Sequence, residues 1–457
     1  MSVPVRRRSV AVIGVAAAAL LLAACGGSSD SGSSASPSAS NTDPACADYA
    51  EYGSHEGTKV TVFTSILPPE QQKFEESWAQ FEKCTGIDVV YEGSDQFEAQ
   101  LPTRIQGGNA PDIAFIPQPG LLAKLVQQGG PKAAPEGVVA NVDEFWNSAW
   151  KDYGTVDGTF YAAPLGSNMK SFVWYSPKVF TEKGYTVPTT WDDLVSLSDQ
   201  MVKDGIKPWC GGIESGGATG WLATDWIEQL VLRQQGGEVY DKWITNEVKF
   251  NSPEIQEAFT TLEGWMRNSE YANAGIGDTK TIATTAFQDG GKPILDAKCG
   301  MYQQASFYAA QWPSFKKDVT IAEDGDVFAF YLPQIEADIP TPIVGGGEFV
   351  TAFADRAEVQ SFQTYLSSDT FATLKVAAGG WVSANSGVPL DTYTDPISQL
   401  SAKYLTDANA TFRFDASDLM PAQVGAGSFW KQMTAFFAEN KSVQETTDAI
   451  QASWPTS

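Results

Sequence analysis

The sequence predicts an α/β fold with doubly wound sheets arranged in two lobes, and three observations support this prediction. The chain has 457 residues, 43% hydrophobic and 19% charged, which is a folding composition long enough for two buried cores. Strand-like and helix-like segments alternate between residues 59 and 128. A second series of such segments begins after Pro164. No internal repeat, P-loop or GxGxxG motif is visible.

The elements of the first lobe follow from hydrophobic periodicity. Lys59–Phe63 alternates with a period of two, as expected of a strand. Pro68 and Pro69 then open a helix in which Phe74, Trp78 and Phe81 share one face. The next predicted elements are, in order, a strand at 87–91, a helix at 97–106, a buried parallel strand at 113–116 and a helix at 121–128.

This βαβαβα order indicates where a ligand would bind in the first lobe. Ligands of doubly wound sheets bind beyond the carboxyl ends of the strands. The polar residues at those positions are Thr64, Ser65, Ser94, Asp95 and Gln118.

The second lobe is predicted from a shorter series of elements. Its strand is 172–175, its first helix is 191–202, and a glycine-rich turn at 213–220 leads into a helix at 224–235. Asp225 lies between Trp221 and Trp226, and residues 221 and 225 of a helix share a face. One indole ring and one carboxylate are therefore expected to meet the same ligand, although either tryptophan also suits a core.

The first 57 residues are predicted to be an export signal and a tether. Arg6, Arg7 and Arg8 precede an apolar run from 10 to 24, which is too short to span a bilayer comfortably. The run ends in Leu-Ala-Ala before Cys25, which resembles a bacterial lipobox whose cysteine is acylated. We therefore expect a lipoprotein signal peptide at 1–24 and a lipidated Cys25 followed by a Ser/Gly-rich tether at 25–57. A plain secretory signal is the alternative.

Composition excludes several function classes. Lys plus Arg number 30 and Asp plus Glu number 55, so the formal net charge of −25 argues against nucleic-acid binding. The single histidine, His55, weighs against a zinc site and against a Ser-His-Asp hydrolase. Glu323–Asp326 is too short for an EF-hand loop. We expect no cofactor, no metal and no catalytic residue.

Four cysteines remain once Cys25 is set aside, and an even number in an exported chain suggests two disulfides. Three pairings are possible. We expect Cys46–Cys84, which ties the N-terminal segment to the first helix, and Cys210–Cys299 within the second lobe. Each would contribute about 3–5 kcal/mol on the loop-entropy account. Free buried thiols are the alternative.

Several motifs together resemble one family. They are 81–89 (FEKCTGIDV), 107–114 (GGNAPDIA), 418–421 (DLMP) and 427–430 (GSFW). In this order they resemble the solute-binding lipoproteins of ABC sugar importers, of the maltose-binding-protein type. The segments 208–210, 214–215, 219–221, 224–226 and 413–415 resemble its alpha-glucoside-binding branch more narrowly.

The resemblance implies a two-lobed periplasmic-binding-protein fold whose lobes are joined by a hinge. Lobe 1 would comprise 58–162 and 321–388, and lobe 2 would comprise 163–320 and 389–457. The protein would be an extracytoplasmic monomer, anchored to the cell membrane by its lipid, that passes a sugar to an ABC permease and ATPase complex. The residues expected at the sugar are Thr64, Ser94, Asp95, Gln118, Glu214, Trp221, Thr224, Asp225, Gln304, Trp381 and Trp430.

The chemistry of a sugar suits these residue types. Carboxylates and amides bind hydroxyl groups, and indole rings cover the C–H face of the sugar ring. The glycines at 345–347, just before Glu348, suit a turn or a close approach of backbone to ligand.

Two other functions stay open from sequence. A lipid-anchored glycoside hydrolase would use two of the many carboxylates. The second alternative is a binding protein of the same fold whose cargo is a polyamine, glycerol phosphate or iron. No basic cluster suited to a phosphate is visible in the sequence.

Overall fold

The computed structural model describes residues 43–273, 278–405, 407 and 409–456 of the chain. The expected signal peptide, Cys25 and the tether up to residue 42 lie outside these residues. The described residues belong to one compact unit, which is built around two five-stranded sheets.

In the first sheet four strands run in the same direction, and β14 (Phe349–Ala352) runs opposite to them. β1 (Thr58–Thr64) lies between β2 (Ile87–Gly93) and β3 (Ile113–Ile116), and all three run parallel. β14 pairs antiparallel with β3 and with β6 (Ala162–Pro164). The chain thus reaches this sheet three times from distant parts of the sequence.

Both faces of the first sheet are covered, which explains the continuous apolar sequence of β3. Phe115 packs with Phe74, Trp78 and Phe81 of α1 in one core. The neighbouring Ala114 and Ile116 belong to a second core on the other face. A strand buried on both faces has no polar side to show, so its sequence does not alternate.

The second sheet repeats the plan of the first. β9 (Lys207–Cys210) lies between β10 (Ala272–Asn273) and β11 (Cys299–Gln303), and these three run parallel. β8 (Phe172–Tyr175) pairs antiparallel with β11 and with β12 (Phe328–Tyr331). A large core surrounds this sheet. The fold is therefore α/β with two lobes.

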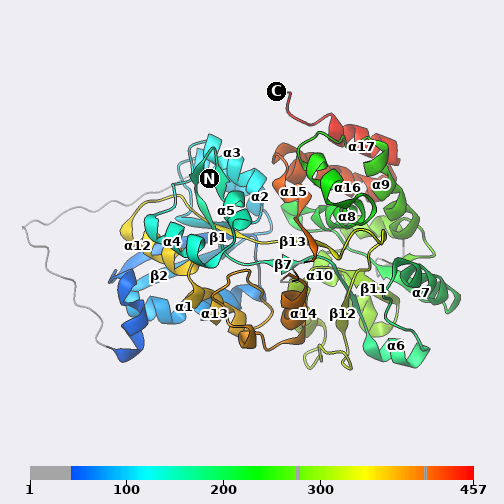
Figure 1. Ribbon diagram of the computed structural model, residues 1–457, viewed down its shortest axis with the longest axis horizontal. Helices are drawn as coiled ribbons and strands as arrows, with labels where there is room; N and C mark the ends of the chain where they lie inside the picture. Colours follow the sequence, from blue (N-terminus) through cyan, green and yellow to red (C-terminus); the bar gives the residue numbers. More distant parts are fainter. Residues whose placement is uncertain (1–42, 274–277, 406, 408, 457) are drawn as a thin grey trace, which may run out of the picture. The chain divides into compact units, whose positions relative to one another are not determined.

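A three-stranded sheet is formed by the segments that cross between the lobes. β13 (Pro342–Gly346) lies between β7 (Asn168–Met169) and β15 (Thr411–Phe414). Figure 1 shows β7 and β13 between the elements of the two larger sheets. We call this the crossing sheet. A two-stranded hairpin joins β4 (Thr155–Val156) to β5 (Thr159–Phe160).

Helices complete both lobes (Figure 1). Around the first sheet are η1 (Pro44–Tyr52), α1 (Glu70–Thr85), α2 (Phe97–Gln106), α3 (Pro119–Gln127), α4 (Glu136–Phe145), α5 (Ser148–Tyr153), α12 (Ala357–Leu366), α13 (Asp369–Ala377) and η6 (Leu390–Thr392). The others are α6 (Pro177–Lys183), α7 (Trp191–Lys203), η2 (Gly216–Ala218), α8 (Trp221–Ile244), α9 (Pro253–Met266), η3 (Thr279–Thr284), α10 (Phe287–Gly290), η4 (Lys292–Asp296), η5 (Ser306–Ala310), α11 (Trp312–Phe315), α14 (Pro396–Leu405), α15 (Ala416–Leu419), η7 (Gln423–Phe429), α16 (Trp430–Ala438) and α17 (Val443–Gln451).

Two boundaries differ from the sequence-based expectation. The predicted first lobe included 321–388, but β12 at 328–331 hydrogen-bonds to β8 in the second sheet, so the chain crosses after Tyr331. The helix expected at 224–235 begins at Trp221 and continues to Ile244 across a kink. The kink is at Gly236, whose φ of 79° lies in the left-handed region that favours glycine.

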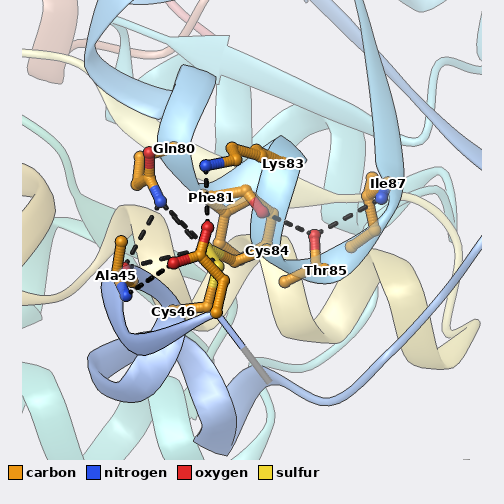
Figure 2. Close-up of a disulfide and its surroundings, with 9 residues drawn as sticks. Ala45, Cys46, Gln80, Phe81, Lys83, Cys84, Thr85 and Ile87 are labelled. Carbon is orange, nitrogen blue, oxygen red and sulfur yellow. Dashed lines mark hydrogen bonds and ion pairs between the residues drawn. A yellow bond between two sulfur atoms is a disulfide. The ribbon is translucent and has the colours of Figure 1, made fainter. Parts of the chain in front are cut away.

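The two expected disulfides are confirmed. Cys46 of η1 is bonded to Cys84 of α1, and Cys210 of β9 is bonded to Cys299 of β11. Figure 2 shows that Gln80 and Lys83 of α1 also reach the N-terminal segment beside the first disulfide. Gln80 Nε2 donates to the Ala45 carbonyl over 3.3 Å. The segment before β1 is thereby held against the first lobe.

Candidate functional site

A cavity of about 260 Å³ lies where the two lobes and the crossing sheet meet. Ser65, Asp95 and Gln118 line it from the carboxyl ends of β1, β2 and β3. Glu214 and Trp221 line it from the turn after β9 and the start of α8. This is the position at which doubly wound sheets bind ligands.

Six of the eleven residues expected at the site line the cavity. They are Asp95, Gln118, Glu214, Trp221, Trp381 and Trp430. The other five, which are Thr64, Ser94, Thr224, Asp225 and Gln304, do not line it.

Four of these five are engaged with the backbone. Thr64 is fully buried, and its Oγ1 accepts from the Ile66 N–H. Ser94 Oγ accepts from the Gln96 N–H. Thr224 and Gln304 are also fully buried, and they bond to the Trp221 carbonyl and the Ala305 N–H respectively.

The position of Asp225 differs from the expectation, which placed its carboxylate at the ligand beside Trp221. It is 1% exposed and turns toward Lys170, whose Nζ lies 3.0 Å from its Oδ1. Trp221 does line the cavity, because it is the first residue of α8 and lies at the helix end. Trp226 packs in the core, with its ring centroid 5.1 Å from that of Trp209.

Aromatic side chains form two walls of the cavity. Trp221 lies 5.2 Å from Phe287 and 6.1 Å from Phe307, measured between ring centroids, and both phenylalanines line the cavity. Trp381 meets Phe74 edge-on at 5.0 Å and is covered by Lys375 Nζ at 4.4 Å. Phe287 and Phe307 were not expected at the site from sequence, because a single phenylalanine in an irregular segment carries no periodic signal.

The cavity is rich in carboxyl groups that sequence reasoning did not single out. Glu70, Glu98, Glu348, Asp415 and Asp418 line it together with Asp95 and Glu214. Burial raises the pKa of Glu70 and of Glu348 to about 7 in each case. Burial also raises the pKa of Glu98, and that of Asp418 well above its usual range, with the nearby Asp415 adding to the latter shift.

Lys170 is the one lysine or arginine that lines the cavity within the described part of the chain. It lies between β7 and β8, is 6% exposed, and its ammonium contacts Asp225 and Asp415. Burial alone would lower the pKa of Lys170, but these carboxylates raise it well above its usual range. The pKa of Asp415 is lowered, since Lys170 outweighs the opposing effect of burial. The pair is therefore charged at neutral pH.

Three buried carboxyls, of Asp225, Glu228 and Asp415, lie close enough together to hold a cation, with one oxygen from each within 4.8 Å of the others. The Lys170 ammonium already contacts two of them. Glu228 accepts from the Ala416 and Ser417 N–H groups. The Lys170 ammonium therefore takes the position that a metal ion would occupy between these carboxyls.

The glycines at 345–347 allow close contact within the crossing sheet. A Cβ on Gly347 would lie 2.2 Å from the Gly166 carbonyl oxygen. Gly346 and Gly347 both line the cavity, and a Cβ on Gly346 would meet the side chains of Asn168 and Lys170 at 3.2 Å. The absence of side chains here lets the crossing strands approach and keeps the cavity floor open.

Several buried polar atoms at the cavity have no partner among the described residues. They are Gln118 Oε1, Ser167 Oγ, Asn168 Oδ1 and Trp381 Nε1. Gln118 and Ser167 are 4% and 5% exposed. Buried polar groups are normally satisfied, so atoms of this kind at a cavity indicate a polar ligand.

The fold and this cavity define a solute-binding protein, in which two α/β lobes enclose a ligand site at the crossing sheet. A family model described as bacterial extracellular solute-binding protein matches residues 66–373. The chain belongs to this family.

Two relatives are similar over nearly their whole length. The osmoprotective compounds-binding protein GgtB of Synechocystis sp. is 34% identical over 417 residues, which cover 90% of this chain and 96% of the relative. The alpha-glucosides-binding periplasmic protein AglE of Rhizobium meliloti is 34% identical over 411 residues, which cover 87% of each chain.

Solved structures share the fold at lower identity. The solute receptor AcbH superposes with a TM-score of 0.74 at 18% identity, covering 86% of this chain and 98% of that one. RafE in complex with raffinose gives a TM-score of 0.67 at 17% identity, covering 87% and 98%. The family match and the two relatives favour a binding protein over the hydrolase considered from sequence.

Proposed function

We propose that this protein binds an alpha-linked glucoside in the cavity and delivers it to an ABC permease, without catalysis. The observation that carries the proposal is the lining of the cavity, where Trp221 and Trp381 accompany seven carboxyl groups. Indole rings cover the C–H face of a sugar, and carboxylates accept from its hydroxyls. The relative AglE, whose name gives alpha-glucosides, supports this ligand class.

The size of the cavity supports a short ligand. Its volume of about 260 Å³ is just below the range of ~300–1,000 Å³ typical of small-molecule sites. A disaccharide is therefore a better match than a long oligosaccharide. The unpartnered Gln118 Oε1 and Asn168 Oδ1 are both acceptors, which suits a ligand with many hydroxyl donors.

Closure of two lobes would report the bound state to the permease. The two lobes are the first sheet with its helices and the second sheet with its helices, and the crossing sheet would serve as the hinge. A ligand favours a closed state only if it contacts both lobes. Asp95 and Gln118 from one lobe, and Glu214 and Trp221 from the other, supply such contacts.

The protein would work outside the cytoplasm as a lipid-anchored monomer. Among the described residues no helix has both the length and the apolar sequence needed to cross a bilayer. Acylation of Cys25 would supply the membrane attachment, and the serine-rich segment after it would let the lobes reach the permease.

Calorimetry with maltose, trehalose and sucrose tests the proposal. We expect at least one of them to bind with a micromolar constant, which corresponds to about −8 kcal/mol. Putrescine and glycerol 3-phosphate, which represent the other cargoes, should give no heat of binding. If none of the three sugars binds, the ligand class is wrong. Glucose appearing during incubation with a sugar would instead indicate the hydrolase.

A further inference from the structure

Lys170 occupies an unusual place at the cavity. It lies in the short crossing segment between β7 and β8, so its backbone belongs to the link between lobes. Its amide N–H donates to the Val344 carbonyl of β13, which fixes the segment to the neighbouring crossing strand. The side chain then runs over Gly346, whose missing Cβ leaves room for it. The ammonium is therefore held at the cavity floor.

The partners of the ammonium leave one hydrogen for a ligand. An ammonium has three N–H donors. The carboxylates of Asp225 and Asp415 account for two, and within the described residues Nζ makes no third hydrogen bond. The Trp221 ring lies 5.3 Å from Nζ, at the distance of a cation–π contact. The third donor thus lies beside a cavity wall that carries an indole ring.

Lys170 is also linked through its acidic partner to Trp430, another ring of the cavity lining. Asp415 Oδ1 accepts from Ser417 Oγ over 2.8 Å, and Trp430 Nε1 lies 3.4 Å from that hydroxyl oxygen. Trp221 and Trp430 are thereby both linked to one ammonium. A ligand ring packed against either tryptophan would lie within reach of Lys170.

Lys170 carries the one cationic donor among the described residues that line the cavity. The carboxyl groups and the unpartnered oxygens of Gln118 and Asn168 can accept hydroxyl hydrogens but leave the hydroxyl oxygens unbound. Each sugar hydroxyl offers both an O–H donor and lone pairs. A charged donor binds more strongly than neutral donors such as Ser167 Oγ and Trp381 Nε1. The single fixed cation therefore distinguishes one hydroxyl oxygen of the ligand from the others.

We propose that Lys170 binds the sugar directly, by donating its third N–H to one hydroxyl oxygen, and that Asp225 and Asp415 position it. This inference rests on the proposed function, and it makes Lys170 a residue that selects which glucoside is bound. Asp225 contributes to binding through Lys170 and not by touching the sugar.

The test uses calorimetry with whichever of maltose, trehalose and sucrose binds the wild type, and with the monodeoxy analogues of that sugar. Removing the hydroxyl that Lys170 binds should weaken wild-type binding roughly 10- to 100-fold. Lys170→Met should weaken binding of the parent sugar by a similar factor. Against this variant, the analogue lacking that hydroxyl should bind about as well as the parent.

Two further variants separate binding from folding. Lys170→Met leaves buried carboxyls without their cation and can destabilise the fold, so Lys170→Met/Asp415→Asn also removes one of the two carboxylates that face the ammonium. It is compared with Asp415→Asn alone. Lys178→Met is the matched control. Lys178 Nζ lies 2.6 Å from Asp326 Oδ1, and neither residue lines the cavity. This variant should leave the affinity unchanged.

The outcomes are distinct. If every monodeoxy analogue is penalised as strongly in the folded Lys170 variants as in the wild type, Lys170 does not bind a hydroxyl and the inference fails. If the variants bind the parent sugar as the wild type does, the inference also fails, while the proposed function stands. If the wild type binds none of the three sugars, both the proposed function and this inference fail.

Discussion

Asp225 Oδ1 lies 3.0 Å from Nζ of Lys170, and of these two residues only Lys170 borders the cavity. The acidic residue between two tryptophans therefore contacts a lysine of the crossing segment instead of lining the cavity. This arrangement couples α8 of the second lobe to the link between lobes.

Asp225→Ala is expected to weaken binding of an alpha-glucoside by about 1–3 kcal/mol, because Lys170 loses one of the two carboxylates that hold it. Calorimetry measures the change. Asp241→Ala is the control, since Asp241 lies on the same helix but pairs with Arg413 on the surface. Unchanged affinity in a folded Asp225 variant would contradict the positioning role.

Trp221 and Trp226 should respond differently to replacement by alanine. Trp221→Ala removes a ring at the cavity and should weaken sugar binding by about 1–2 kcal/mol, with a smaller effect on unfolding. Trp226→Ala leaves a hole beside Trp209 in the core and should cost about 3–5 kcal/mol of unfolding free energy. Titrations and denaturant unfolding of both variants compare the two. Equal losses of stability would argue against this division.

Removing the Cys210–Cys299 disulfide should destabilise the protein slightly more than removing Cys46–Cys84. The bonded cysteines are 89 and 38 residues apart, and the loop-entropy account gives about 4.6 and about 4 kcal/mol. Denaturant unfolding of the two double serine variants measures the difference. A much larger loss for the Cys46–Cys84 variant would show that fixing the N-terminal segment matters more than loop length.

The ligand-free protein should lose stability between pH 5 and pH 7 partly through Glu70 and Glu348. Burial raises the pKa of each from 4.5 to about 7, so the folded state keeps protons that the unfolded chain has released. This contribution is present below pH 4.5 and is lost as the pH rises through 7. Melting temperatures of Glu70→Gln/Glu348→Gln should therefore fall less than those of the wild type across this range. Parallel curves would contradict the assignment.

Cys25→Ser should move the protein from the membrane fraction to the soluble fraction of cells that express it. The apolar run before Cys25 and the serine-rich segment after it motivate this expectation. Fractionation with immunoblotting is the measurement, and Cys46→Ser is the control that keeps the proposed lipid site. Membrane retention of the Cys25 variant would show that another part of the chain attaches it.

The sequence by itself determined the elements and much of the architecture. Helical spacing of Phe74, Trp78 and Phe81 predicted α1, and the apolar run at 113–116 predicted β3, because a local pattern records which faces of an element are buried. The even number of cysteines in an exported chain pointed to two disulfides. Residues just after strands, such as Asp95 and Gln118, were placed at the cavity by the rule for parallel sheets.

The tertiary structure alone decided which charged residues surround the cavity. Lys170 and Asp415 are 245 residues apart in the chain, and each lies in a short crossing or terminal segment without a periodic pattern. The place of β12 in the second sheet also depends on where the chain crosses between the lobes. So does the orientation of the Asp225 side chain, which points to Lys170 and does not line the cavity. Local sequence reports burial of one element against its neighbours. The meeting of three distant segments at one ammonium depends on how the whole chain crosses between its lobes.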